Sequence, residues 1–224
     1  MKINILYRPA HTMAQIWLAP NESIVAEAGA MVGMSTNLAL QTQTGGLLKG
    51  LKRLFAGETL FRNTFTAEGG NGELLLAHAL CGDMAALELT PPGYFLASSA
   101  FIASSPHVEI ETRGGGLRGF FSGAGMFVLK ATSQAAGQIV VGGFGGIVEM
   151  ACDGNLVIDT GHLVAWDAAL QYKVGRSGSG WIASLFSGEG LVCHFSGKGR
   201  VWVQTRNSGA YGSALGRVLP ARVS

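Results

Sequence analysis

One pattern of short apolar segments occurs three times along the chain, and this self-similarity constrains the fold more than any other feature. The passages that align are Ile24–Met34, Tyr94–Ser104 and Leu156–Trp166. Each contains two short apolar segments around a turn of small residues, such as Ala28–Gly29 in the first passage. Apolar segments this short, bounded by turns, are typical of β-strands. The sequence therefore predicts an all-β protein built from related units.

The similarity continues downstream of each passage. There, apolar and polar residues alternate, which is the pattern of a half-buried strand. The alternating segments are Leu38–Thr42, Val108–Thr112 and Leu170–Val174. A glycine-rich stretch and an apolar loop follow in every copy, and the loops share a phenylalanine at a spacing of about 65 residues. These phenylalanines are Phe55, Phe121 and Phe186.

The copies are not separated by any linker rich in proline, serine or charge, so we expect one compact domain over 1–224. Its architecture would be three pseudo-repeats of a β-sandwich or barrel unit packed as one body. The expected boundaries are about 14–77, 78–142 and 143–204, with a C-terminal tail over 205–224. We interpret Gly82–Gly93 and Gly146–Asn155 as hairpins inserted between copies, because both contain turn residues such as Asp153–Gly154.

Composition narrows the function classes. The 34 glycines suit many tight turns, and a net charge of +2 gives little attraction for nucleic acid. Cys81, Cys152 and Cys193 form no CxxC pair, so we expect neither a disulfide framework nor a zinc site. Residues 1–8 lack the pattern of a signal peptide, and no apolar run reaches the about 18 residues of a spanning helix. We expect a cytoplasmic protein with no transmembrane segment.

Four longer stretches resemble bacterial members of the altered-inheritance-of-mitochondria twenty-four family, which is a mitochondrial biogenesis family. They are Ala26–Met34, Leu48–Phe65, Asp159–Val174 and Ser187–Asn207, and they are spread over nearly the whole chain. The resemblance implies a fold similar to the tryptophan RNA-binding attenuation protein (TRAP), whose β subunits form a ring. It implies no enzyme activity, no cofactor and no catalytic residues.

Paired carboxylates are the best argument for an enzyme, since acid–base chemistry requires them. Two copies carry such a pair, Glu27 with Glu58 and Asp159 with Glu189, but no histidine or lysine recurs beside them. We therefore interpret these residues as caps of turns and solvated strand ends. The histidines form no metal-binding spacing, and we interpret His162 as a hydrogen-bonded strand residue. The sequence predicts no catalytic, cofactor or metal site.

RNA binding would require stacking aromatic residues interleaved with arginine. The chain offers Trp202 with Arg206, and Lys198 with Arg200. These residues are too sparse for a nucleic-acid surface, so we interpret them as a solvated face.

The loop that precedes each shared phenylalanine is apolar in all three copies, although connections between strands are normally polar. The candidate interface residues in these loops are Leu47, Leu51, Leu117, Phe120, Trp181 and Ile182. The loops either fold back over an open end of the β unit or contact another subunit or a lipid surface. Basic residues accompany only the first loop, at Lys49, Lys52 and Arg53, so membrane contact is the weaker variant.

Two functional classes stay open. The first is a non-enzymatic assembly or scaffold protein that forms a homo-oligomer, a trimer or a similarly small ring. It would act through an unidentified protein partner or a peripheral membrane contact. The second is a ring-type binding protein for a small molecule or RNA, by analogy with TRAP.

Overall fold

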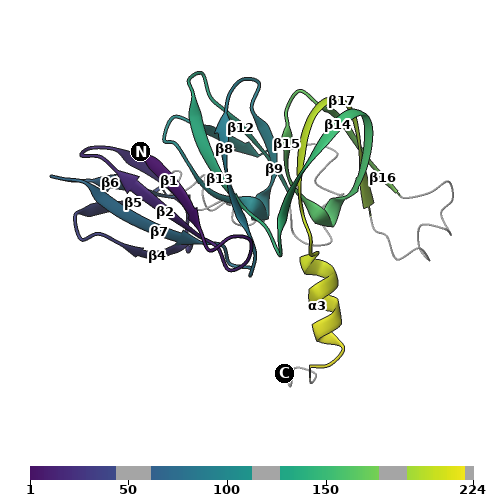
Figure 1. Ribbon diagram of the computed structural model, residues 1–224, viewed down its shortest axis with the longest axis horizontal. Coiled ribbons are helices and arrows are strands. Elements are labelled where there is room, and N and C mark those ends of the chain that lie inside the picture. The colour runs from purple at the N-terminus through teal and green to yellow at the C-terminus, as the bar shows by residue number, and fades with distance from the viewer. Residues whose placement is uncertain (44–61, 113–126, 177–190, 220–224) are drawn as a thin grey trace, which may run out of the picture.

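A computed structural model of the chain describes residues 1–43, 62–112, 127–176 and 191–219. These residues form antiparallel β-sheets followed by one C-terminal helix, which confirms the prediction of an all-β fold. The first, middle and last thirds of the chain lie side by side along the long axis of the molecule (Figure 1).

The strands of the first third are β1 (Lys2–Leu6), β2 (Met13–Leu18), β3 (Ser23–Glu27), β4 (Met31–Met34), β5 (Leu38–Gln43), β6 (Arg62–Ala67) and β7 (Gly72–Ala77). The middle third contains β8 (Met84–Leu89), β9 (Tyr94–Ala97), the 3-10 turn η1 (Ser98–Ala100), β10 (Phe101–Ser104), β11 (Glu109–Thr112), β12 (Val128–Thr132) and β13 (Gly137–Gly142). The last third contains β14 (Ile147–Asp159), the 3-10 turn η3 (Thr160–His162), β15 (Leu163–Asp167), β16 (Gln171–Arg176), β17 (Leu191–Gln204) and helix α3 (Ser208–Gly216).

The thirds share one set of antiparallel pairings. In the first third β2 and β4 both pair with β7, while β3 and β5 both pair with β6. In the middle third β8 and β10 pair with β13, while β9 and β11 pair with β12. In the last third the single long strand β17 replaces two strands and pairs with β14, β15 and β16.

A β-bulge occurs at the same place in every third. The register shifts between Met31 and Gly33 in β4, and the same shift occurs in β10 and β15. The residues within the shifts are Val32, Ile102 and Val164. A bulge inserts one residue into the strand, so that a side chain points toward a different face of the sheet from the one that regular alternation predicts.

The interpretation of Gly82–Gly93 and Gly146–Asn155 as inserted hairpins is wrong. These segments supply β8 and the first half of β14, which pair with β13 and β17 as β2 pairs with β7. The Asp153–Gly154 dipeptide does not reverse the chain, because β14 continues through it to Asp159. Gly154 (φ +112°) of β14 lies opposite Gly197 (φ +107°) of β17. Both long strands therefore have a positive backbone φ at the same point, which glycine adopts freely.

Adjacent thirds are joined by one repeated strand pairing. Strand β10 of the middle third pairs with β3 of the first, with Ser104 opposite Val25. Strand β15 of the last third pairs with β9 of the middle, with Trp166 opposite Phe95. In both junctions, the strand after the turn of one third extends the sheet of the preceding third.

The hydrophobic cores of the first and middle thirds each include a residue from the third that follows. The core of the first third includes the fully buried Ile102, which comes from β10 of the middle third. The core of the middle third includes the fully buried Val164, which comes from β15 of the last third. Each of these two bulge residues therefore fills the core of the preceding third rather than its own.

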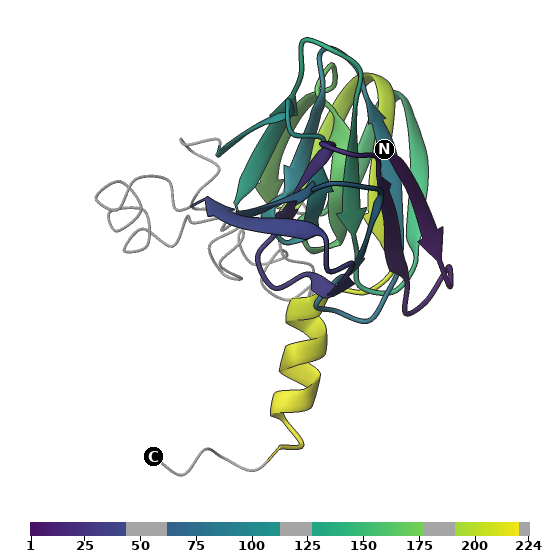
Figure 2. The ribbon, with the colours of Figure 1, turned by 90° about the vertical axis from the view of Figure 1, so that its left-hand side faces the viewer.

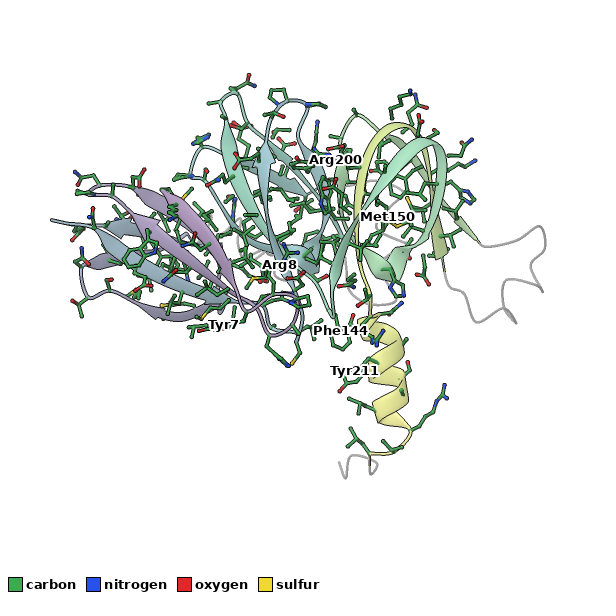
Figure 3. All side chains as sticks on the ribbon, viewed as in Figure 1. Tyr7, Arg8, Phe144, Met150, Arg200 and Tyr211 are labelled. Carbon is green, nitrogen blue, oxygen red and sulfur yellow. The ribbon has the colours of Figure 1, made fainter. Side chains whose placement is uncertain are left out.

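Polar contacts reinforce both junctions, where Arg8 and Arg200 lie (Figure 3). Arg8 forms an ion pair with the buried Asp83 between the first and middle thirds. Arg200 donates hydrogen bonds to Asp167 and to the hydroxyl of Tyr94, which links the last third to the middle third. A buried ion pair adds little net stability, because removing its charges from water offsets much of their attraction.

Candidate assembly surface

Strand β4 is an open sheet edge. Its equivalents β10 and β15 each pair on both sides, whereas β4 pairs within the described part of the chain with β7 alone. We call its residues Met31–Met34 the β4 edge. Val32 is 57% exposed, although Ile102 and Val164 at the equivalent bulge are completely buried. The β4 edge therefore leaves in solvent the apolar side chains that its counterparts bury.

The C-terminal half of β14, in the last third, is another strand edge that lacks, within the described ranges, a neighbour its equivalents have. Its equivalents β3 and β9 pair on both sides, whereas β14 pairs with β17 alone among the described strands. We call its residues Leu156–Asp159 the β14 edge. Val157 is 54% exposed and lies opposite His194 of β17.

The core beneath the β14 edge is incomplete relative to the other two cores. Leu156 and Ile158 pack against the core of the last third but remain only partly buried. The equivalent residues of β3, Ile24 and Ala26, are completely buried. The difference arises because β10 covers the first core, while no strand following the last third occurs in the described chain.

Neither edge carries the proline or lysine with which natural sheets often block edge-to-edge pairing. Strand β4 is short and bulged, which also discourages edge pairing, but its equivalents β10 and β15 carry the same bulge and still pair on both sides. Proline, inward-pointing charge and lysine normally protect an open strand. The β4 edge, MVGM, contains none of them, and in the β14 edge only the terminal Asp159 is charged. Asp159 accepts a hydrogen bond of 2.7 Å from the backbone N–H of Gly161, so its carboxylate is already used in capping η3.

The six loop residues that we expected to form an interface lie outside the described residues. They are Leu47, Leu51, Leu117, Phe120, Trp181 and Ile182. The three loops leave the described structure after β5, β11 and β16 and return at β6, β12 and β17. Their interface role stays a prediction, and the two open edges are surfaces that the sequence analysis did not identify.

Of the four carboxylates that the sequence analysis paired, the structure describes only Glu27 and Asp159. Glu58 and Glu189 lie outside the described residues, so the structure describes neither predicted pair in full. Glu27 ends β3, and burial raises its pKa to about 7. Asp159 caps a turn, as the sequence predicted. His162 lies in η3, where its Nδ1 is 2.7 Å from the carbonyl oxygen of Gln204.

Two hollows on the described part of the surface are small for a ligand. A hollow of about 120 Å³ lies beside His107, and another of about 240 Å³ lies beside Tyr172 and His194. Typical ligand pockets have volumes of about 300–1,000 Å³. Across the described ranges, no group of three histidine, cysteine, aspartate or glutamate side chains could hold a metal ion.

The residues considered for RNA contact are largely engaged within the protein. Trp202 is buried and packs edge-on against Tyr94. The Arg200 guanidinium lies 4.8 Å from the centre of the Trp202 ring and also binds Asp167. Lys198 forms an exposed ion pair with Asp153. A base could not stack on Trp202 without opening this junction.

Helix α3 projects from the body of strands (Figures 1 and 2). None of its residues is buried, and Tyr211 contacts Phe144 of the body edge-on. Leu215, Val218 and Leu219 are exposed on or just after the helix. Among the described helices, none is long and apolar enough to cross a membrane.

Comparison with known proteins identifies the family to which the chain belongs. The chain matches the family described as mitochondrial biogenesis AIM24 over residues 3–206. It is 31% identical over 219 residues to an uncharacterised protein of Streptococcus pyogenes serotype M6, covering 93% of this chain and 87% of that protein. A crystal structure of a Streptococcus pyogenes protein is similar with a TM-score of 0.81 and 28% identity, covering 97% of this chain and 99% of that one. The chain therefore belongs to the mitochondrial biogenesis AIM24 family.

Proposed function

We propose that this protein is a non-enzymatic assembly or scaffold protein that acts as a homo-oligomer through its β body. The observation that carries the proposal is that the β4 edge and the β14 edge, in the first and last thirds, each lack in the described chain the second neighbouring strand that their equivalents have. Exposed apolar strand edges are costly to keep in a monomer because they promote association. A protein with two of them is suited to hold copies of itself, and through them a partner, in a defined arrangement.

The chemistry of the described residues supports the non-enzymatic part of this proposal. Glu27 has a raised pKa but lies at the end of a strand, and within the described residues no histidine or lysine is hydrogen-bonded to it. Cys193 is buried and has a pKa of about 12, so it is not a nucleophile at neutral pH. A catalytic site requires a nucleophile or base together with a positioned partner group.

A ring-type binding protein for a small molecule or RNA is the alternative. It is supported less well, because the hollows beside His107 and His194 are small and Trp202 is buried. In this alternative, such a ligand would bind at subunit junctions or at the three apolar loops.

Native mass spectrometry of the protein, released from cells under mild conditions, tests the proposal against this alternative. We expect oligomers whose mass is a whole multiple of the chain, with no additional bound mass. A small molecule or RNA retained in fixed stoichiometry would instead support the binding protein. A monomer without a ligand would contradict both.

Peripheral membrane contact is part of the same proposal, with helix α3 as the segment that supports it. Leu215, Val218 and Leu219 expose apolar surface next to the basic Arg217. Such a short segment gives weak binding that grows with anionic lipid. Co-sedimentation with vesicles of phosphatidylcholine, with and without phosphatidylserine, measures it. A truncation after Arg206 should lose any binding, whereas retained binding would remove α3 from the proposal.

A further inference from the structure

We infer that the β4 edge of one chain pairs with the β14 edge of a second copy, in the same antiparallel register that joins the thirds within one chain. This inference rests on the proposed function and specifies its contact surface. The interface would be head-to-tail, since each copy contributes a different edge. Each copy would then offer its remaining edge to a further copy.

The register follows from the two junctions within the chain. Alignment of the three passages places Met34, Ser104 and Trp166 at one position. Ser104 lies opposite Val25 and Trp166 lies opposite Phe95 in the two junctions. In the same alignment, Val25 and Phe95 are equivalent to Val157 of the third passage. The repeated pairing therefore predicts that Met34 lies opposite Val157 of the second copy, and Gly33 opposite Ile158.

Burial supports the same pairing independently of backbone register. The bulge residues Ile102 and Val164 each insert into the core of the preceding third and are completely buried there. Their counterpart Val32 is exposed, and the core of the last third has only partly buried residues, Leu156 and Ile158, where the insertion would occur. Val32 of one copy would complete this core in the next. A branched apolar side chain and an incomplete apolar core are thus complementary.

The β4 edge and the β14 edge of a single chain cannot pair with each other. The β4 label lies in the first third and the β14 label in the last third, with the middle third between them (Figure 1). A second copy is the occupant that the repeated geometry specifies. A head-to-tail contact of this kind produces a closed ring when its rotation returns to the start, and a filament otherwise.

Cysteine cross-linking tests the register. Two variants are prepared in a Cys81→Ser background, which removes the exposed native thiol: one carries Met34→Cys and the other Val157→Cys. Opposed residues of an antiparallel pair have Cα atoms about 4.5–5.5 Å apart, which lies within the about 4.4–6.8 Å that a disulfide spans. After the variants are co-refolded and mildly oxidised, we expect a disulfide-linked dimer in the mixture and none in either variant alone.

Charge substitutions test the same surface without a cross-link. Val32→Lys and Val157→Lys place a charge in the inferred interface, while Val148→Lys provides a matched control on the same strand β14. Val148 is 46% exposed and lies outside the β14 edge. We expect the first two variants to be folded and monomeric, and Val148→Lys to keep the mass of the wild-type oligomer.

The outcomes separate this inference from the proposed function. An oligomeric wild type with no mixed disulfide, and with Val32→Lys still fully assembled, would overturn the β4–β14 pairing while leaving an assembly protein. A disulfide in the Met34→Cys variant alone would show that like edges meet, which also overturns it. A wild type that is monomeric at all concentrations would overturn the proposed function together with the inference.

Discussion

Arg8 and Asp83 form a two-pronged ion pair between the first and middle thirds of the chain. The Arg8 Nε donates to Oδ1 of Asp83 at 3.0 Å, and Nη2 donates to Oδ2 at 2.8 Å. Asp83 is almost fully buried, and its Oδ1 also accepts a hydrogen bond from the backbone N–H of Met84. The hairpin of β1 and β2 is thereby fastened to the start of β8.

The first prediction concerns this ion pair. Arg8→Ala leaves a buried carboxylate without its cation, so we expect the free energy of unfolding to fall by about 1–3 kcal/mol. Lys198→Ala is the control, because the Lys198–Asp153 pair is exposed on both sides and should contribute about 0.5 kcal/mol or less. Urea unfolding at one protein concentration measures both. Equal effects of the two substitutions would contradict the structural role of Arg8.

The second prediction concerns pH and Glu27. Burial raises the pKa of Glu27 to about 7 from an ordinary value of 4.5. Between these values the folded chain binds more protons than the unfolded chain. The stability that Glu27 contributes is therefore fully present below about pH 4.5 and is lost as the pH rises through about 7.

The Glu27→Gln substitution should remove the contribution of Glu27 to the pH dependence of the free energy of unfolding. The variant should therefore be more stable than the wild type above about pH 7. Urea midpoints of both proteins across this window give the comparison. Parallel curves for wild type and variant would show that Glu27 does not titrate with a raised pKa.

The third prediction concerns the thiols. Cys81 is exposed, whereas Cys152 and Cys193 are buried. Burial also raises the pKa of Cys193 to about 12, which keeps its thiolate population negligible. Titration with an aromatic disulfide reagent should therefore modify one thiol per folded chain and three after denaturation. Rapid modification of a second thiol in the folded protein would indicate that the core around β17 is more open than described.

The fourth prediction compares two equivalent bulge residues. Ile102→Ala removes a completely buried side chain and should lower the free energy of unfolding by about 2–5 kcal/mol. Val32→Ala, measured on chains diluted to the monomer, should change it by about 0.5 kcal/mol or less, because Val32 is exposed there. A large effect of Val32→Ala in the monomer would mean that this residue already packs within its own chain.

The sequence allowed the fold class to be predicted because the same local signals recur. In Ile24–Met34 the structure has β3 and β4 around the predicted turn, and in Tyr94–Ser104 it has β9 and β10. In the segment Gly82–Gly93, turn residues at the C-terminal end obscure the strand signal of β8. Strand β14 was misinterpreted because Asp153–Gly154 has the composition of a turn, although pairing with β17 holds it in one strand.

The open edges could not be predicted from the sequence. Val32, Ile102 and Val164 are all branched apolar residues in similar contexts, and nothing local indicates that only Val32 is exposed. Exposure depends on which strand lies next to each one, and that is decided by the order of the thirds in space. The sequence instead favours the apolar loops as an interface, because their composition departs from that of ordinary strand connections.

We propose that the chain assembles with copies of itself, and light scattering coupled to size-exclusion chromatography measures this assembly. The chain has a mass of 23.3 kDa. We predict a molar mass that is a whole multiple of this value, with three copies expected first, and a shift toward the monomer for Val32→Lys. A wild-type mass of 23.3 kDa at every concentration loaded would contradict the claim.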